Sequence, residues 1–381
     1  MLAHLVHHLL TALPVPLLPF IRDDFALDYT QSGVVISAFS LSYGIGQLPA
    51  GWLADRIGPR ILLTIGICGV ALAGLLVGLS QTYILMIVFL ALMGIAGGGY
   101  HPSAAPLITA SVEPKNQGRA LGIHLIGGSG SFFLAPLVAA AIAAVWGWRG
   151  SFIALAVPTV VFGIIFYLLL GRRVDTGKTR RSVTERADGI PSSPGHLRRL
   201  VAFMALSISA QAMIFSTIAF VPLFMVDHFG VGEEAAAVFL AIIYSAGLWA
   251  SPLGGYLSDR LGKVPVALTA CFIAVPAIYS LNLVPYGQGI SIGALLLLIG
   301  MAMYIRMPVS EAYIVSHTSE RRRSTILGIY YFASMETGGI LAPVVGSFID
   351  RIGFYSTFTI VSVALLIVTL TASVFLWGNR G

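Results

Sequence analysis

The sequence predicts an all-α polytopic membrane protein with 12 transmembrane helices, arranged as two pseudo-symmetric six-helix bundles. Three observations predict this fold class. Hydrophobic residues make up 57% of the 381 residues and charged residues only 10%, whereas a soluble protein carries about 25% charged residues. The mean hydropathy of +0.90 is too high for a surface that faces water. Long apolar runs also recur along the chain, and motifs beside them repeat at a nearly constant spacing.

Twelve apolar runs are long enough to cross a membrane. A helix of about 20 residues spans the hydrocarbon layer of about 30 Å, and these runs are too long and too continuous for barrel strands. The expected spans are residues 1–20, 32–54, 61–80, 83–110, 120–146, 151–170, 198–225, 236–257, 264–284, 290–317, 324–348 and 354–378.

Lysine and arginine are distributed unevenly between the two sides of these spans. Of the 22, eighteen fall on one side, Arg22, Arg149 and Arg351 fall on the other, and Arg306 lies inside a span. Cytoplasmic loops carry the excess of positive charge, so we expect both termini in the cytoplasm and the chain in a bacterial inner membrane. Because the net charge of +6 comes from short loops, we predict no nucleic-acid partner.

A polar segment near the middle divides the chain. Residues 171–199 are basic and rich in Gly, Pro and Ser, a composition typical of a flexible tether. We therefore predict an N-terminal six-helix bundle over residues 1–170, a cytoplasmic linker over 171–199 and a C-terminal six-helix bundle over 200–381.

The two halves contain an internal repeat. The segment GWLADRIGPR at 51–60 returns as GYLSDRLGK at 255–263, with Asp55 204 residues before Asp259. Three further pairs are RALGI with TILGI, LAPLV with LAPVV and, more weakly, GWRGSF with GFYSTF. Parallel repeats of six helices predict two bundles related by an axis along the membrane normal, with a cavity between them near the midplane.

The first copy of this motif carries a family resemblance. The pattern G-x-L-x-D-R-x-G-x-R is present as Gly51, Leu53, Asp55, Arg56, Gly58 and Arg60. With the repeat, it resembles the major facilitator superfamily over the whole chain. The resemblance implies a secondary transporter that works by alternating access. It also implies a cytoplasmic gating latch at Asp55, Arg56, Gly58 and Arg60, repeated at Asp259 and Arg260.

A finer resemblance rests on segments of the first half. His4 and the segment at 17–33, YHPSAAPLI at 100–108 and the stretch at 118–140 are similar to the fosmidomycin-resistance branch of the superfamily. That branch implies export driven by the proton gradient. The glycines of 118–140 look like a loose form of the family's antiporter motif, in which small residues let helices touch closely.

Three charged residues lie inside predicted spans of the second half. A charge at the bilayer centre costs at least about 2.5–3.5 kcal/mol, so Arg306, Glu311 and Glu336 should face a cavity or one another. Their counterparts 206 residues earlier are Tyr100, Ala105 and Gly130, so the shared architecture does not require the charges. We expect Arg306 to bind an anionic or polar substrate group, and Glu311 or Glu336 to carry the coupling proton. The alternative is a structural ion network among the three.

Further polar residues complete the predicted site. The substrate-binding candidates besides Arg306 are His101, Tyr100, Gln47, Gln211 and Tyr330. His4 and His124 are candidates for proton coupling besides the two glutamates, because histidine titrates near neutral pH. The histidines lack a supporting element such as HExxH, so we assign no metal site.

The motifs that would indicate an enzyme are missing. The sequence contains no G-x4-GK[ST] loop, nucleophile elbow or zinc pattern, so we predict a protein that is not an enzyme and uses no cofactor, with the proton gradient as its driving force. The expected function is proton-coupled export, by antiport, of a small amphiphilic or anionic compound. The partners are the small-molecule substrate, protons and membrane lipid, and the chain is expected to be a monomer. The alternatives are proton-coupled uptake of a small organic anion and a non-transporting membrane receptor.

Overall fold

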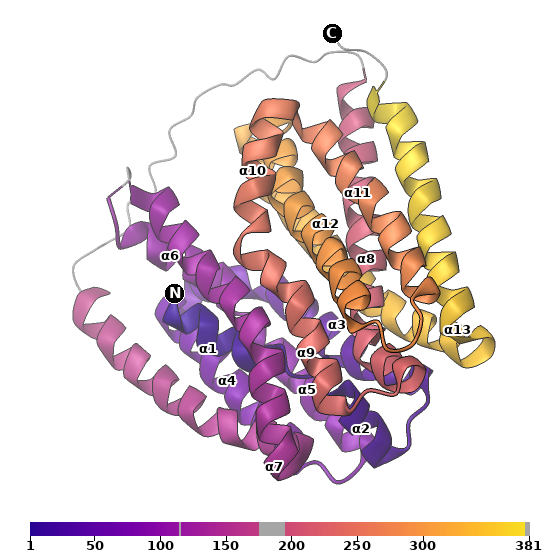
Figure 1. Cartoon of the computed structure of the whole chain (residues 1–381). Coiled ribbons are helices and arrows are strands. Elements are labelled where there is room, and N and C mark those ends of the chain that lie inside the picture. The colour runs from indigo at the N-terminus through magenta and orange to yellow at the C-terminus, as the bar shows by residue number, and fades with distance from the viewer. Residues whose placement is uncertain (114–115, 175–194, 378–381) are drawn as a thin grey trace.

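The computed structural model describes residues 1–113, 116–174 and 195–377, which fold into helices and contain no strand (Figure 1). The helices of the first half are α1 (Leu2–Thr11), α2 (Leu18–Phe25), α3 (Tyr29–Ile57), α4 (Pro59–Leu79), α5 (Tyr83–Gly97), α6 (Tyr100–Ala110) and α7 (Gln117–Val174). Those of the second half are α8 (His196–Phe229), α9 (Glu233–Ser245), η2 (Ala246–Leu248), α10 (Ala250–Leu261), α11 (Lys263–Ser280), η3 (Leu281–Leu283), α12 (Gly289–Ser316) and α13 (Glu320–Trp377).

These helices correspond in order to the twelve predicted spans. By length and composition, seven helices of the described residues could each cross a membrane, and an eighth arises if α9 and α10, bent by 42°, count as one. Two of the seven are 58 residues long and change direction at a glycine, so each supplies two predicted spans. The spans expected at 1–20 and 32–54 coincide with α1–α2 and with α3. These helices are not among the seven, and α1 and α2 are each too short to cross a membrane alone.

The glycines at the sharp bends show that the repeat extends to the backbone. Gly147 has φ 68° and ψ 172°, and Gly353, 206 residues later, has φ 74° and ψ 171°. Gly58 has φ 87° and ψ 143°, and Gly262, 204 residues later, has φ 91° and ψ 150°. Side chains disfavour positive φ, so these glycines permit the same turns in both halves. The predicted internal repeat is confirmed.

Helices also approach closely at equivalent places. A Cβ atom on Gly94 of α5 would overlap the carbonyl oxygen of Phe39 in α3. In the second half, a Cβ atom on Gly300 of α12 would overlap the carbonyl oxygen of Ile243 in α9. Small residues allow such contacts in membranes, where apolar lipid provides little drive for helix association. The same glycine contact therefore supports the packing of both halves.

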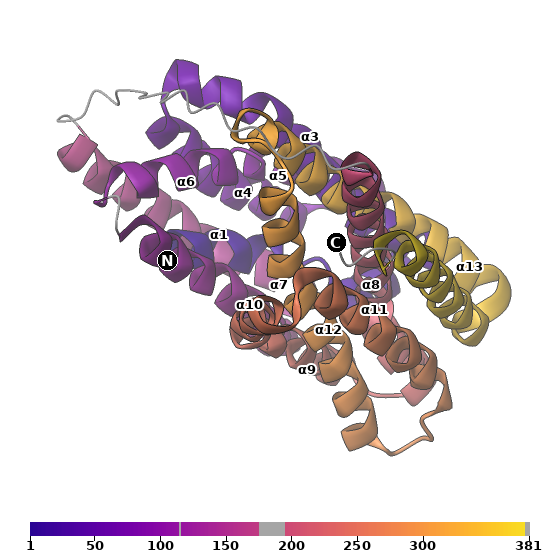
Figure 2. The ribbon, with the colours of Figure 1, turned by 90° about the horizontal axis from the view of Figure 1, so that it is seen from above.

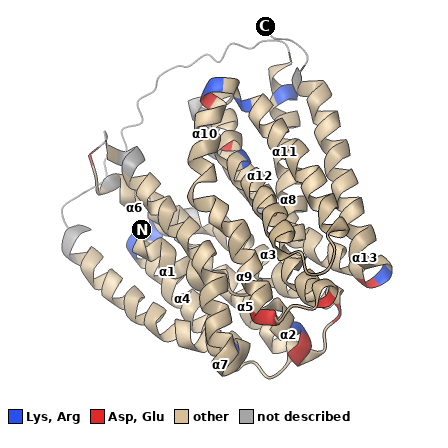
Figure 3. Cartoon of the chain, in the orientation of Figure 1, with Lys and Arg blue, Asp and Glu red and all other residues tan. Residues whose placement is uncertain are grey.

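The helices of the two halves lie on opposite sides of the molecule when it is seen from above (Figure 2). The halves meet through α3 with α13 and through α7 with α9. Most of the charged residues that the ribbon colours lie toward the two ends of the bundle, and a few lie within it on α12 (Figure 3). We call the end that holds the turn between α10 and α11 the linker end, and the end with α2 the distal end (Figure 1). Most of the predicted linker at 171–199 lies outside the described residues, so the domain boundaries stay a prediction.

We predict that Gly300→Ala lowers the stability of the fold while Gly255→Ala does not. A Cβ atom at Gly300 would overlap Ile243, whereas one at Gly255 has no neighbouring heavy atom within 4 Å. Overpacking costs about 1–3 kcal/mol, and an unhindered Gly-to-Ala change in a helix gains up to about 1 kcal/mol. Thermal unfolding in detergent measures both variants. Equal melting temperatures would contradict the close contact.

Candidate functional site

Arg306 occupies the centre of the second half. It lies on α12 and is fully buried. Its Nη1 donates to the carbonyl oxygen of Ser207 at 2.8 Å, and its Nη2 donates to Oε1 of Gln211 at 2.5 Å. Its Nε is buried without a hydrogen-bond partner. Both acceptors belong to α8, so the guanidinium holds α8 against α12, and its Nε donor stays without a partner.

The ion network proposed as the alternative does not form among the described residues. Arg306 has hydrogen-bond partners on α8 but, within the part of the chain that the structure describes, no carboxylate in salt-bridge contact. Glu311, one and a half turns further along α12, instead accepts a hydrogen bond from Tyr331 of α13. The structure therefore separates the two charges that are five residues apart in the sequence and directs them to different helices.

Glu336 lies at the interface between the two halves. Its side chain is 7% exposed, and its Oε1 atom is buried without a hydrogen-bond partner. The carboxyl group rests against Gly44 of α3, where a Cβ atom would overlap Oε1. A buried carboxylate without a partner is costly. The position of Oε1 therefore suits a neutral carboxyl better than a charged one.

A cluster of five histidines fills the corresponding region of the first half. His4, His7 and His8 project from α1, and His101 and His124 come from α6 and α7. Nε2 of His8 lies 3.2 Å from Nε2 of His101, and the ring of His4 stacks on that of His124 at 4.1 Å. The predicted residues His4, His101 and His124 thus lie together. His7 and His8 complete the group, although neither was among the predicted site residues.

Tyr100 and Arg306 occupy equivalent places in the repeat. Both side chains are fully buried, and both contact the first helix of their own half, α1 for Tyr100 and α8 for Arg306. Tyr100 stacks on His7 with ring centroids 4.3 Å apart, as Arg306 contacts Ser207 and Gln211. The hydroxyl of Tyr100 has no hydrogen-bond partner. The equivalent positions therefore differ in role. Tyr100 is the centre of a cluster of aromatic and imidazole rings, and Arg306 is a cation surrounded by neutral acceptors.

Two remaining candidates lie apart from these clusters. Gln47 is half-buried on α3. Tyr330 is buried in an apolar cluster that includes Phe203 and Val309, and its ring lies 5.6 Å from that of Tyr331. The position of Tyr330 is that of a core residue, so its predicted substrate contact would require a rearrangement.

The predicted latch residues lie at the linker end and make contacts within their own halves. Arg56 covers the ring of Trp52 at 4.1 Å, and Arg260 covers the ring of Tyr256 at 4.7 Å, which repeats the same pair 204 residues later. Arg60 donates to the carbonyl oxygen of Tyr167 at 2.7 Å. The remaining latch candidates are Gly58 at its turn, Asp259, which is exposed, and Asp55, whose side chain lies outside the described part.

Polar contacts instead join the halves at the distal end. The carboxylate of Asp350 on α13 accepts from the backbone nitrogens of Tyr29 and Thr30 at 2.9 and 2.8 Å. It therefore caps the N-terminus of α3, where a negative charge is favourable. Arg22 forms an ion pair with Asp227 of α8. We call these contacts the distal lock. Sequence analysis missed it, although the acids near residue 28 and at 350 mark helix ends.

A further contact of the distal lock involves a phenol outside the predicted spans. Tyr29 donates its hydroxyl to Oδ2 of Asp227 at 2.7 Å. Burial and this hydrogen bond raise the pKa of the Tyr29 phenol above its usual value, so the group remains a donor at neutral pH.

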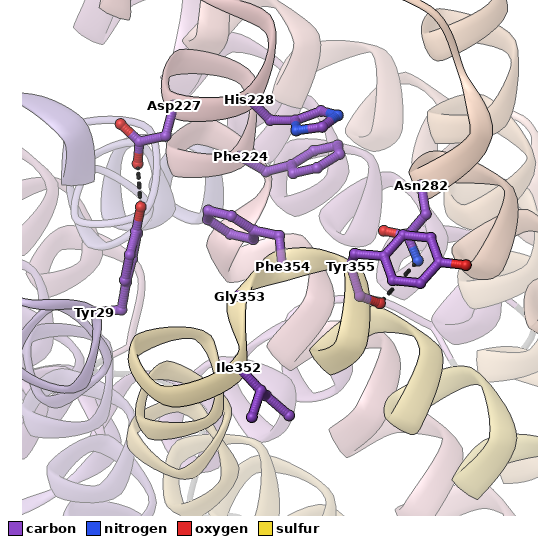
Figure 4. A pocket seen from close by; sticks show the side chains of 9 residues that line it. All are labelled: Tyr29, Phe224, Asp227, His228, Asn282, Ile352, Gly353, Phe354 and Tyr355. Atoms are coloured by element: carbon purple, nitrogen blue, oxygen red, sulfur yellow. Dashed lines mark hydrogen bonds between the residues drawn. The ribbon is translucent and has the colours of Figure 1, made fainter.

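A cavity of about 340 Å³ borders the distal lock (Figure 4). It lies where α3, α8, η3 and α13 meet, and its lining residues are Tyr29, Phe224, Asp227, His228, Asn282, Ile352, Gly353, Phe354 and Tyr355. The predicted substrate-binding residues lie elsewhere. The cavity therefore lies at the distal end, where the polar contacts of the distal lock join the two halves.

The fold and the repeated motif define a transporter, and comparisons identify its family. The model of the Major Facilitator Superfamily matches residues 1–335, so the chain belongs to this family. It is 26% identical to the probable sulfoacetate transporter of Cupriavidus necator, over 94% of this chain and 87% of that protein. It is 22% identical to the fosmidomycin resistance protein of Escherichia coli, over 100% of this chain and 92% of that protein.

The solved structures support the same fold. A bacterial homolog of the human lysosomal transporter Spinster, in an inward-facing and unoccupied conformation, superposes with a TM-score of 0.77 at 19% identity, over 99% of this chain and 94% of that one. The chain is thus a multi-pass membrane transporter with a small-molecule substrate and not an enzyme. Membership of this family also shows that the alternative of a non-transporting membrane receptor was wrong.

We predict that Gln211→Leu destabilises the second half and that adding Arg306→Met restores much of the loss. The single change leaves a donor of the buried guanidinium without its acceptor, which costs about 1–3 kcal/mol or more for a charged group. Removing both partners eliminates the unpaired charge. Thermal unfolding of the two variants and of Arg306→Met provides the comparison. A double variant that melts below Gln211→Leu would show that the pair stabilises the fold in another way.

Proposed function

We propose that this transporter exports a small amphiphilic or anionic compound in exchange for protons, by alternating access. The observation that carries the proposal is the position of Glu336, whose Oε1 is buried without a hydrogen-bond partner against Gly44 in the contact between α3 and α13. A titratable group at this contact can link proton binding to the relative position of the halves. Such a link is the minimum that a proton-coupled exchanger requires.

The proposed cycle follows from the cost of ionising Glu336. When the carboxyl is protonated, it fits between the helices and the distal end stays closed. When it loses its proton, the buried charge weakens the contact and favours separation of α3 from α13. Proton binding thus shifts the population toward the distally closed state. Because the predicted latch residues make contacts within their own halves here, we place the latch contact between the halves in the opposite state.

Arg306 supports an anionic substrate. Its Nε has no hydrogen-bond partner, and its charge has no acidic partner among the described residues. A phosphonate, sulfonate or carboxylate group would satisfy both requirements, because guanidinium binds such oxyanions with its planar donors. Gln211 is half-buried beside it and could exchange its bond to Arg306 for one to substrate. His101 and Tyr100 supply polar and aromatic surface from the first half.

Uptake of an organic anion is the second candidate. It is favoured by the likeness to a probable sulfoacetate transporter, since sulfoacetate is a small organic anion. Export is favoured by the likeness to the fosmidomycin resistance protein, which covers this chain completely. Proteoliposomes with an imposed pH gradient of either polarity separate the two directions. Fosmidomycin and sulfoacetate are the first probes for such flux measurements.

We predict that Glu336→Gln keeps the distal end closed at every pH. The test uses spin labels at Gln81→Cys and Tyr286→Cys, two exposed distal positions in opposite halves, in a Cys68→Ser and Cys271→Ala background. Distances measured by electron spin resonance should lengthen in the parent as pH rises, and should not change in the Glu336→Gln protein. The matched variant Glu311→Gln removes a carboxylate that lies outside the contact between α3 and α13. It should therefore keep the lengthening of the distance as pH rises.

Two results would count against the proton role of Glu336. One is an unchanged pH response in Glu336→Gln, and the other is full pH-driven flux of a transported probe by that variant. If Glu311→Gln alone lost the response, the coupling proton would belong to Glu311 instead.

The proposed setting is the bacterial inner membrane, where the chain acts as a monomer among lipids, with the proton gradient as its driving force and no other cofactor. We predict that both termini and the linker face the cytoplasm, because lysine and arginine gather on that side. Alkaline phosphatase fused to the C terminus should then be inactive, whereas a fluorescent protein fused at the same place should fluoresce. Active phosphatase would reverse the orientation and the assigned direction of transport.

A further inference from the structure

Three histidines of the first half place their ring nitrogens within reach of a single ion. One nitrogen from each of His4, His8 and His101 lies within 4.8 Å of one from each of the others. His4 and His8 are one turn apart on α1, so they project from the same face, and α6 brings His101 to them. No metal site was predicted here from the sequence, because the histidines lack a supporting element such as HExxH.

The spacing of His8 and His101 fits metal coordination. Their Nε2 atoms lie 3.2 Å apart. In a tetrahedral zinc site with bonds of about 2.0–2.1 Å, two ligand nitrogens are about 3.3–3.4 Å apart. Two of the three ligands are therefore already at the required separation. A shift of His4 within the same cluster would complete a three-nitrogen set.

The hydrogen bonds of the other ring nitrogens fix the protonation that a metal requires. Nδ1 of His4 lies 2.8 Å from the carbonyl oxygen of His124, which can only accept, so His4 carries its proton on Nδ1. Nδ1 of His8 lies 3.0 Å from the hydroxyl of Thr11, whose own proton points to the carbonyl oxygen of His8. Both imidazoles thus keep the Nε2 lone pair free. Metal-ligating histidines typically make such bonds with the second nitrogen.

Packing holds the rings in these orientations. The ring of His4 stacks on that of His124 at 4.1 Å with an interplanar angle of 7°, and it stacks on Tyr100 at 5.5 Å. A Cβ atom on Gly128 would collide with the imidazole of His4. His4 and His8 are buried, and His101 is half-buried and gives access from outside the cluster.

We propose that His4, His8 and His101 bind one divalent transition-metal ion of the zinc, cobalt and nickel class. Neutral imidazole ligands suit these ions, whereas magnesium and calcium prefer oxygen ligands. Three protein ligands leave the fourth position of a tetrahedral ion open to water or an anion. The ion would join α1 to α6. This site is independent of the proton role of Glu336, since it lies wholly within the first half.

Cobalt provides the test, because tetrahedral Co²⁺ absorbs visible light far more strongly than octahedral Co²⁺. Full-length protein without a histidine tag is stripped with a chelator, reconstituted in nanodiscs and titrated with Co²⁺. We expect tetrahedral absorption that saturates at one ion per chain and disappears when Zn²⁺ is added. Purely octahedral absorption, or none, from the unaltered protein would overturn the proposal without reference to any variant.

Variants then assign the ligands. His8→Ala and His101→Ala should abolish the tetrahedral absorption, and Thr11→Val should weaken Co²⁺ affinity by about 10–100-fold through loss of the bond to Nδ1. The matched control is His228→Ala, a histidine of α8 that stacks on Phe224 outside the cluster, and it should bind as the parent does. If all four variants bind Co²⁺ like the parent, the ion lies elsewhere and the proposal fails.

Discussion

The close contact between α3 and α13 is the constraint on which the arrangement of the two halves depends. A Cβ atom on Gly33 would lie 2.6 Å from the carbonyl oxygen of Ala342, and one on Gly346 would overlap that of Tyr29. Only glycine lets the backbones approach so closely. At this distance Asp350 reaches the N-terminus of α3, and Glu336 reaches Gly44. A polar cap and a titratable carboxyl therefore depend on the same glycine-lined contact.

The repeat gives the two halves the same backbone arrangement, but their buried side chains differ in chemical type. Turns at Gly147 and Gly353, with almost identical backbone angles, show how far the frame is shared. Yet Tyr100 and Arg306, at equivalent positions, are the centres of unlike clusters. The first half gathers imidazole and phenol rings, whereas the second gathers a permanent cation with neutral acceptors. Equivalent places in the repeat thus hold clusters of different chemistry.

Residue patterns predicted the fold well because it depends on local signals. Apolar runs set the helices, and the repeated motif located the turn glycines Gly58 and Gly262. The site was harder to predict from the sequence, because its side-chain contacts join helices that are far apart in the sequence. Nothing in the spacing of Arg306 and Glu311 reveals that one bonds to α8 and the other to Tyr331. The distal lock was missed for the same reason, since Asp350 caps a helix more than three hundred residues away.

The charge of Arg306 has a consequence for substrate choice. A buried cation without an acidic partner retains an unfavourable free energy that hydrogen bonds to neutral acceptors only partly offset. Ser207 and Gln211 supply dipoles but no negative charge. An anionic ligand that reached the guanidinium would provide the missing charge in a region of low dielectric, where the attraction is strong. A cationic ligand would meet a charge of the same sign and be repelled. If Arg306 contacts the substrate as proposed, the second half therefore disfavours cationic substrates before any shape is considered.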